Sequence, residues 1–458
     1  MNWTGKDLIR LGYEPAKWFG ELLEVSNRLG FNELDIITLA DTKVNTTPSY
    51  LPLKDPSEYN YSVNIRNDYY NNTNADAVMD TMMEVLRTPT VVDEGLGGTI
   101  MPDSCPAGPV GTIPVGGVVV TKNAIHPGMH SADICCSVMV SDLGNADPKA
   151  VMDAAYDNCH FGPGGRDDFD REVPRELMEK IRLNSFTSGI KAVNMAKSHL
   201  GTSGDGNHFI YVGTHEYTGN TMLVTHFGSR GFGAQVYKAG MRVAEKYRRA
   251  LSPETLKQNA WIPADTKEGK EYWDALKLVR EWTKTNHLSL HSVIAGEVGK
   301  FVHYGETTFW NPHNFVSRDG DLFYHYKGAT PLDDKFTTDS VDGLRIIPLN
   351  MAEPILVVKG ETTYGNMGFA PHGAGRNMSR SAYKRALGSR NPLDVLVEET
   401  KGLDIRFKSG VPDVSEGPGA YKNAQKVIDD IEYFGLGEIQ YKILPYGSIM
   451  GGEYPRKW

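Results

Sequence analysis

Gly111-Thr-Ile-Pro-Val-Gly-Gly-Val-Val-Val120, followed by Ser137-Val-Met-Val-Ser141, is the stretch that decides the fold. Short β-branched runs joined by tight glycine turns are typical of strands. Similar strand patterns return later in the chain, and helical periodicity lies between them, with strands at residues 345–360 and 439–444 and helices at 166–200 and 236–300. Strands and helices that intermix along the chain predict an α+β fold of mixed β-sheets with flanking helices.

The first 90 residues have a different character. Pro15 precedes a run of apolar residues from Trp18 to Val25 at helical spacing, which predicts an amphipathic helix. Residues 41–75 are rich in Asn, Asp, Thr, Tyr and Pro and favour a loop, and Ala77–Leu86 favours a second helix. The sequence contains no internal repeat, low-complexity tract or clear linker, so we predict a single domain over residues 1–458.

The composition excludes several classes of protein. The chain has 458 residues and a net charge of -9, so contact with a nucleic acid would need a local basic patch. Cys135 and Cys136 are neighbours, which disfavours a secreted disulfide framework and favours a reducing compartment. The sequence has no apolar run of about 18 residues, so we expect no membrane-spanning helix and a cytoplasmic protein.

Five residues form a candidate metal site. Asp133 and Cys136 are three positions apart, so one tight turn could direct both side chains to the same point. His208, His226 and His313 each lie at the edge of a strand or loop beside small or polar residues. A thiolate can bridge two cations, and imidazole and carboxylate are common ligands. Taken singly, each residue also has a plain interpretation, as a small buried thiol or a hydrogen-bonded core histidine.

The most informative segment is Phe369-Ala-Pro-His372-Gly-Ala-Gly-Arg376-Asn-Met-Ser-Arg380. Gly373, Ala374 and Gly375 permit close approach of backbone amides to a phosphate. Arg376 and Arg380 are four residues apart and are expected to share a helix face suited to phosphate contact. The plain alternative is a glycine turn that caps a helix carrying two solvated arginines.

Several segments together resemble the RtcB family of tRNA-splicing RNA ligases. The resemblance runs from about residue 90 to the C-terminus and is less clear over residues 1–90. It rests on the following segments, in chain order: Met101-Pro-Asp103, Asp133-Ile-Cys-Cys136, Gly206-Asn-His-Phe209, His226-Phe-Gly-Ser-Arg-Gly231, His313-Asn-Phe315, Lys327-Gly-Ala-Thr330, His372-Gly-Ala-Gly-Arg376 and Gly419-Ala-Tyr-Lys422.

The resemblance implies a reaction. His372 attacks the α-phosphate of GTP to form a histidine–GMP adduct, GMP passes to an RNA 3′-phosphate, and a 5′-hydroxyl displaces it. The family also opens 2′,3′-cyclic phosphate ends. The implied substrate is RNA with broken ends, such as tRNA, and some family members require an activating protein.

The resemblance also implies roles for particular residues. Two Mn²⁺ ions are held by the five candidate ligands, with the Cys136 thiolate bridging, although ligand softness alone would also suit Zn²⁺. Asn207 and Asn314 are placed to bond phosphate or ribose oxygens, and Tyr421 is a retained residue of the nucleotide pocket. Asp103 could orient the incoming hydroxyl.

The sequence departs from the family pattern where guanine would be recognised. Tyr211 stands where the family has a glutamate, Ile355 where a serine is expected, and Met450 where a lysine contacts guanine. Cys105 replaces a usual histidine. Loss of the carboxylate should relax guanine preference by about 1–3 kcal/mol. We therefore predict a ligase with altered nucleotide specificity.

Two other functions fit the same residues. A metal-dependent RNA-end phosphodiesterase would keep only the hydrolytic half of the reaction. A protein that binds RNA ends or a nucleotide, without ligase activity, would keep the metal for structure alone.

Overall fold

The computed structural model describes residues 2–46, 50–66, 74–106, 112–166 and 171–454. These residues form two compact units. The smaller unit comprises residues 1–52 and 249–253, and the larger unit comprises residues 53–248 and 254–458. All the candidate site residues belong to the larger unit. A single domain over residues 1–458 stays a prediction.

The smaller unit contains three helices: α1 (Gly5–Arg10), α2 (Trp18–Leu29) and α3 (Glu33–Thr46). The predicted amphipathic helix is α2, which ends at Gly30 in the left-handed conformation (φ 65°). Leu22 on α2 packs with Trp3, Leu8 and Ile36 in a small core. The predicted loop at residues 41–75 is wrong in part, because the apolar spacing of Ile36 and Ala40 continues the helix and later residues form a strand; residues 47–49 and 67–73 lie outside the described ranges.

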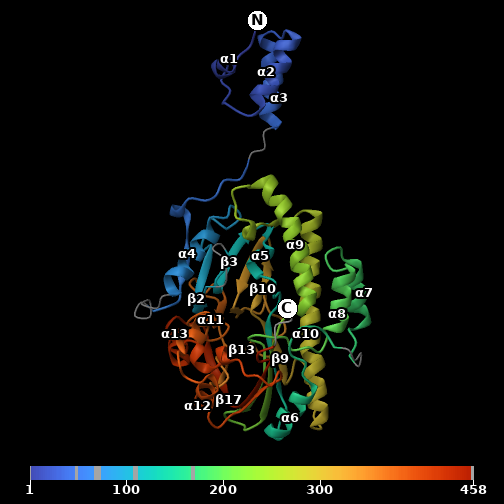
Figure 1. The fold of residues 1–458 in the computed structure, drawn as a ribbon, viewed down its shortest axis with the longest axis vertical. Coiled ribbons are helices and arrows are strands. Elements are labelled where there is room, and N and C mark those ends of the chain that lie inside the picture. Colours follow the sequence, from blue (N-terminus) through green and yellow to red (C-terminus); the bar gives the residue numbers. More distant parts are fainter. Residues whose placement is uncertain (1, 47–49, 67–73, 107–111, 167–170, 455–458) are drawn as a thin grey trace. The chain divides into compact units, whose positions relative to one another are not determined.

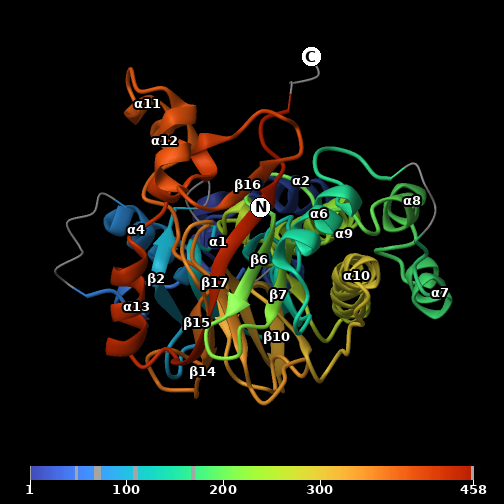
Figure 2. The same cartoon turned by 90° about the horizontal axis from the view of Figure 1, so that it is seen from below.

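An eight-stranded sheet is the main scaffold of the larger unit. Its order is β13-β14-β17-β6-β7-β5-β9, with β16 paired to β17. All pairs are antiparallel except β16 with β17, and Figure 2 shows β17, β6 and β7 beside one another. The bounds are β5 (Ser137–Asp142), β6 (Phe209–His215), β7 (Thr221–Phe227), β9 (Thr308–Pro312), β13 (Arg345–Pro348), β14 (Ile355–Lys359), β16 (Asp404–Phe407) and β17 (Glu438–Met450).

A five-stranded sheet has the order β1-β2-β3-β11-β10, and two small pairs join β12 with β15 and β4 with β8. The predicted strand at residues 111–120 corresponds to β3, which begins at Val115; residue 111 lies outside the described ranges. The bounds are β1 (Tyr61–Val63), β2 (Gly98–Cys105), β3 (Val115–Lys122), β4 (Ala124–Ile125), β8 (Ile262–Pro263), β10 (Asn314–Asp319), β11 (Leu322–Lys327), β12 (Ala329–Pro331) and β15 (Phe369–Pro371).

Helices flank both sheets. Figure 1 shows α9 and α10 side by side, with α7 and α8 beyond them. The helical pattern predicted at residues 236–300 corresponds to two helices, α9 and α10, which a proline-containing segment carrying β8 separates. The bounds are α4 (Asn74–Leu86), α5 (Pro127–His130), α6 (Pro148–Asn158), α7 (Arg175–Leu183), α8 (Ile190–Ser198), α9 (Arg230–Leu251), α10 (Lys267–Glu297), α11 (Arg380–Ala386), α12 (Pro392–Glu399) and α13 (Ala424–Tyr433).

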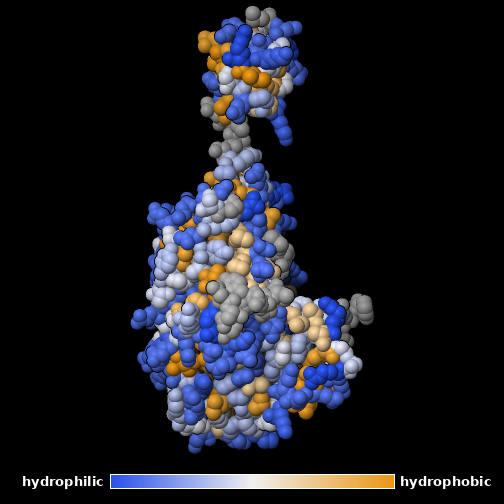
Figure 3. Space-filling view, turned by 90° about the vertical axis from the view of Figure 1, so that its left-hand side faces the viewer, coloured by the Kyte–Doolittle hydropathy of each residue, from blue (hydrophilic) through white to orange (hydrophobic). Residues whose placement is uncertain are grey.

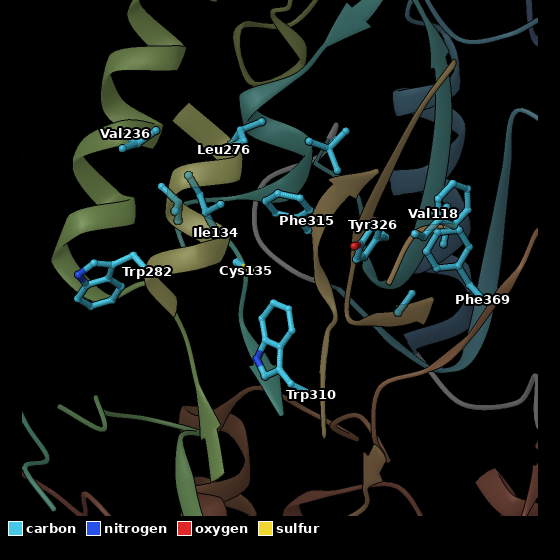
Figure 4. Packing of buried hydrophobic residues seen from close by; sticks show 14 of the residues in the cluster. Val118, Ile134, Cys135, Val236, Leu276, Trp282, Trp310, Phe315, Tyr326 and Phe369 are labelled. Carbon is cyan, nitrogen blue, oxygen red and sulfur yellow. The ribbon is translucent and has the colours of Figure 1, made fainter. Parts of the chain in front are cut away.

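The largest core cluster joins α10 to both sheets. Trp282 of α10 and Trp310 of β9 are fully buried in it, and Tyr326 and Phe369 extend it toward the five-stranded sheet (Figure 4). Large aromatic side chains contribute most of the buried apolar area of such a core. The mixed sheets with flanking helices confirm the predicted α+β fold.

A row of hydrogen-bonded polar side chains crosses the layer between α10 and the eight-stranded sheet. His287 and His291 of α10 both contact the Thr225 hydroxyl of β7, at 2.7 and 2.8 Å. His287 also reaches the Ser137 hydroxyl and His291 the Ser141 hydroxyl of β5. All of these side chains are fully buried. Both histidines are therefore core residues whose ring nitrogens have hydrogen-bond partners.

Figure 3 shows one face of the molecule in space-filling form. The face seen in Figure 3 is mostly hydrophilic, with hydrophobic residues scattered over it. Single exposed apolar residues of this kind are normal on folded proteins and do not indicate a binding surface. Among the described residues, no helix is both long enough and apolar enough to cross a membrane.

Candidate active site

The five candidate metal ligands converge at one end of the eight-stranded sheet. Asp133 and Cys136 lie in the turn that leads into β5, and His208 directly precedes β6. His226 lies within β7, and His313 links β9 to β10. Because β6, β7, β5 and β9 are consecutive neighbours in the sheet, residues distant in sequence are brought to the same edge.

The turn before β5 separates two adjacent cysteines. Cys135 adopts a positive φ of 62°, and its amide donates to the Asn314 carbonyl at 2.6 Å. The Cys135 side chain enters the main core beside Ile134 and Trp310 (Figure 4). Cys136 instead lines the cavity described below. All four cysteines of the chain are free thiols.

The ligand atoms form two groups that share Cys136. One consists of Cys136, His226 and His313, and the other of Asp133, Cys136 and His208, with the ligand atoms of each group within 4.8 Å of one another. The Cys136 sulfur lies 3.1 Å from His226 Nε2 and 3.5 Å from His208 Nε2. The Nε2 atoms of His226 and His313 are 3.0 Å apart.

Hydrogen bonds orient two of these imidazoles. His208 Nδ1 lies 3.1 Å from the Ser203 carbonyl, and His226 Nδ1 lies 3.1 Å from the Asn207 carbonyl. An Nδ1–H that donates to a carbonyl leaves the Nε2 lone pair for a metal. His313 Nδ1 is buried without a partner among the described residues. The donors present therefore fit one or two thiolate- and imidazole-bound cations.

Burial shifts the pKa values of Cys136, His226 and His313. It raises the pKa of the Cys136 thiol well above its ordinary value, and the Asp133 carboxylate raises that pKa further. Burial also lowers the pKa values of His226 and His313 well below the ordinary value. The two imidazoles are thus neutral near pH 7 and able to bind a cation, whereas the thiol loses its proton only when a cation replaces it.

His372 lies beside this cluster and is paired with Asp103. The His372 ring centroid is 4.9 Å from that of His313. Asp103 Oδ2 lies 2.5 Å from His372 Nδ1 and accepts a bond from the His372 amide at 3.1 Å. Asp103 is fully buried, and the His372 side chain is 17% exposed. The carboxylate therefore fixes the ring and leaves Nε2 as the outward nitrogen.

The glycines after His372 are required by the backbone. Gly375 has a φ of 72°, and a Cβ there would lie 1.9 Å from the Asp103 carbonyl oxygen. A Cβ on Gly373 would lie 2.7 Å from the Pro348 carbonyl oxygen. With Ala374, these residues line the cavity that holds His372. The backbone of residues 373–375 thus packs closely against Asp103 and Pro348 and also lines the cavity.

Arg376 and Arg380 do not share a helix face, which corrects the sequence prediction. α11 begins only at Arg380, because the Ser379 side chain caps it by accepting the Ala382 amide. The two arginines meet instead at Glu416, at 2.5 and 2.7 Å. The Tyr421 hydroxyl donates to the same carboxylate at 2.6 Å.

Glu416 was not anticipated from the sequence. It is almost completely buried, yet it lines the cavity together with Arg376 and Tyr421. Its only sequence signal is a position shortly before the Gly419-Ala-Tyr-Lys422 segment. Lys327 and Ser448 also line the cavity without having been selected as site residues.

One cavity connects all these parts. Its lining includes the cluster residues Asp133, Cys136, His226 and His313, together with Asn207, Asn314, His372 and Arg376. The Asn314 side-chain oxygen accepts a bond from the Gly328 amide at 2.7 Å. Asp103 and His208 do not line the cavity. Asp103 contacts the lining residue His372, and His208 contacts the lining residue Cys136.

The three divergent positions lie on a wall of the same cavity. Tyr211, Ile355 and Met450 all line it. The Tyr211 hydroxyl donates to the Ile443 carbonyl at 3.0 Å, so this tyrosine is a satisfied core residue as well as a wall. Cys105 also lines the cavity, and burial raises the pKa of its thiol.

The fold and this cavity define a class of protein in which a buried histidine–cysteine cluster lies beside a histidine held by an aspartate. The family model described as tRNA-splicing ligase RtcB matches residues 174–451. Proteins named tRNA-splicing ligase RtcB from Archaeoglobus fulgidus and Aeropyrum pernix are each 25% identical over 418 residues, covering 74% of this chain and 85% of the relative. The namesake from Thermococcus kodakarensis is 24% identical over 413 residues, with the same coverage.

The chain therefore belongs to the RtcB family, as its motifs predicted. The low identity to these relatives agrees with a divergent member.

Proposed function

We propose that this protein is an RNA ligase that joins a 3′-phosphate or 2′,3′-cyclic phosphate end to a 5′-hydroxyl end through a histidine–nucleotide intermediate. Its RNA substrate is RNA with broken ends, tRNA among them. The observation that carries the proposal is the pairing of His372 with Asp103 in the same cavity as the Cys136 cluster.

His372 is the proposed nucleophile. With Nδ1–H donating to Asp103, Nε2 keeps its lone pair and can attack phosphorus. Nε2 forms a bond to the α-phosphorus of a nucleoside triphosphate, GTP in the family, and the bond to pyrophosphate breaks. The imidazolium of the adduct carries a positive charge, which the Asp103 carboxylate compensates.

The next steps consume the adduct. An oxygen of the RNA 3′-phosphate attacks the same phosphorus, and neutral imidazole leaves. The 5′-hydroxyl then attacks the activated RNA phosphate, and the nucleoside monophosphate leaves. Amides of the Gly373–Gly375 loop and the Arg376 guanidinium, which Glu416 holds in place, are suited to bind these phosphates.

Asp133, Cys136, His208, His226 and His313 are the residues that would hold two Mn²⁺ ions, with the Cys136 thiolate shared. When bound, such ions neutralise phosphate charge and orient the leaving group. The neutral imidazoles and the shared sulfur atom are the features of this chain that support a two-ion site, for which Zn²⁺ is the alternative occupant. An activating protein is a further expected partner.

The test is labelling of the protein by α-³²P nucleoside triphosphates with Mn²⁺, followed by a denaturing gel and mass spectrometry. We expect a covalent nucleotide on His372 that disappears after chelation and in His372→Ala. The exposed His303, mutated to Ala, is the control and should label normally. Absence of labelling with every nucleotide, or equal labelling of His372→Ala, contradicts the proposal.

The same preparation distinguishes the alternatives. Opening of cyclic phosphate ends without any nucleotide, retained in His372→Ala, would identify a phosphodiesterase. Tight binding of RNA ends with no change to either end would identify a binding protein.

A further inference from the structure

One wall of the cavity is made by the paired strands β6 and β17. Ser448 lies directly opposite Tyr211 across these strands, and Met450 lies opposite Phe209. All four side chains line the cavity. The residue between them, Ile449, packs on the other side of the sheet with Ile210. The alternation of a strand thus presents two adjacent cross-strand pairs to the same ligand.

This wall is continuous with the reaction centre. Phe209 also lies opposite His226 of β7, with ring centroids 5.2 Å apart. Met450, one strand further, lies about 10 Å from His226 along the sheet, because neighbouring strands are about 4.8 Å apart. This separation is the span of a nucleoside monophosphate, so a phosphate at His226 and His372 places its base against Phe209 and Met450.

The wall carries little hydrogen-bonding capacity. The Tyr211 hydroxyl is occupied by the Ile443 carbonyl, and the Asn350 side-chain oxygen accepts the amides of Ala352 and Glu353. The Ser448 hydroxyl is buried and has no partner among the described residues. On this wall, the Ser448 hydroxyl is therefore the group that can form a hydrogen bond with a bound ligand.

Charged groups of the cavity belong to other parts of it. Asp133 lies in the Cys136 cluster, and Arg376 and Glu416 are paired with each other. Lys327 ends β11, next to Gly328, whose Cα faces the His372 ring. No carboxylate or ammonium group of the described residues stands on β6 or β17 within the lining.

A single hydroxyl matches adenine better than guanine. A hydroxyl donates one hydrogen bond and accepts others, so it can donate to adenine N1 and accept from the N6 amino group. The same edge of guanine presents O6, N1–H and N2–H₂, of which at least one would remain unpaired against this apolar wall. Burial of one unpaired group corresponds to about a 5- to 150-fold loss of affinity.

We propose that the nucleotide transferred to His372 is AMP from ATP, with Ser448 recognising the adenine edge and Phe209 and Met450 packing on the base. This inference rests on the proposed function. The bonds made and broken are those given above: Nε2–phosphorus forms, the bond to pyrophosphate breaks, and pyrophosphate leaves.

The test compares the four α-³²P nucleoside triphosphates as labels of the full-length protein with Mn²⁺. We expect ATP to label His372 with a kcat/KM about 5- to 150-fold above that of GTP. Labelling in which GTP or a pyrimidine nucleotide equals or exceeds ATP overturns the inference but leaves the proposed function standing. Absence of any labelling overturns the proposed function. In that case, equilibrium dialysis measures the affinities of the protein for ATP and GTP. The inference is overturned if ATP does not bind more tightly than GTP.

Ser448→Ala tests the recognising group. We expect KM for ATP to rise toward that for GTP, with kcat nearly unchanged, because the hydroxyl contacts the base and not the reacting phosphorus. Ser26→Ala is the matched control, since Ser26 also has a buried hydroxyl without a described partner but lies in the smaller unit. An unchanged ATP-to-GTP ratio in Ser448→Ala overturns the role of Ser448.

A second variant tests the same wall through a gain of GTP preference, which a folding defect cannot produce. Tyr211→Glu combined with Met450→Lys places an acceptor and a donor on the same wall, and we expect the preference to move toward GTP. Thermal unfolding of each variant identifies a folding defect. A folded double variant that still prefers ATP to the same degree overturns the inference.

Discussion

At the scale of single residues, Asp103 has the clearest assignable effect on the reaction centre. Its Oδ2 contacts both the ring and the amide of His372, and the opposite oxygen is buried without a partner. A carboxylate held in this way fixes the tautomer of the histidine and balances the charge of an imidazolium. Asp103 is thus placed to act through His372, and its role in orienting the incoming hydroxyl stays a prediction.

Asp103→Asn should slow adduct formation by a factor of up to about 10⁴, the effect of the same change in the histidine–aspartate pair of a serine protease. The amide removes the compensating charge and can hold the wrong tautomer, while nucleotide binding should change little. Single-turnover labelling of His372 separates the rate from the affinity. Asp274→Asn, at the exposed surface of α10, is the control. A wild-type rate in Asp103→Asn would contradict the assigned role.

At the scale of elements, the polar row between α10 and the eight-stranded sheet lies directly behind the candidate metal ligands. Thr225 and Ser137 carry hydroxyls of this row, and their chain neighbours His226 and Cys136 are candidate ligands. Because side chains alternate along a strand, the ligand and the hydroxyl project to opposite faces. The hydrogen bonds of this row thus fix the position of α10 relative to β5 and β7, the strands that carry His226 and follow Cys136.

Thr225→Val should lower the free energy of unfolding by about 2–4 kcal/mol, because it leaves a ring nitrogen on each of two buried imidazoles unpaired. Valine has nearly the same shape, so little packing is lost. Urea unfolding followed by circular dichroism measures the change. Thr285→Val, on the same helix with a hydroxyl in an exposed bond to the Glu281 carbonyl, should be nearly neutral. A loss no larger in Thr225→Val than in Thr285→Val would show that the row contributes no stability.

At the scale of the whole molecule, buried histidines contribute to the loss of stability in acid. Burial lowers the pKa of His126 and His291 to about 3 and that of His130 to about 4, from an ordinary value of 6.5. The unfolded chain binds protons at these histidines as the pH falls below 6.5, whereas the native state does not. These histidines therefore do not reduce the free energy of unfolding above about pH 6.5. Below that pH the free energy of unfolding falls, and it continues to fall until the pH reaches about 3.

We therefore expect the unfolding temperature to fall between pH 7 and pH 5, measured with a chelator so that metal release does not contribute. Each such histidine adds up to about 1.4 kcal/mol of lost stability per pH unit within this window. His291→Gln removes one titrating group while keeping polar atoms, so the slope should become shallower even if the variant is less stable at pH 7. An unchanged slope would contradict the assignment of His291.

Much of the fold followed from local pattern. The β-branched runs that became β3 and β5, and the periodic segments that became α2 and α4, are dictated by side-chain spacing along one element. The errors arose where a local signal was weak. Polar residues at positions 41–46 concealed the end of α3, whose buried face is set by Ile36 and Ala40.

The sequence by itself determined the family, the candidate ligands and the histidine loop, because their residue types and order form a specific combination. Only the tertiary structure decided how they act together. Strand order brings His226 between Cys136 and Phe209, Glu416 draws Arg376 and Arg380 to one carboxylate, and β17 places Ser448 opposite Tyr211. These contacts join positions up to hundreds of residues apart. They depend on sheet register and chain packing, which spacing along the chain does not encode.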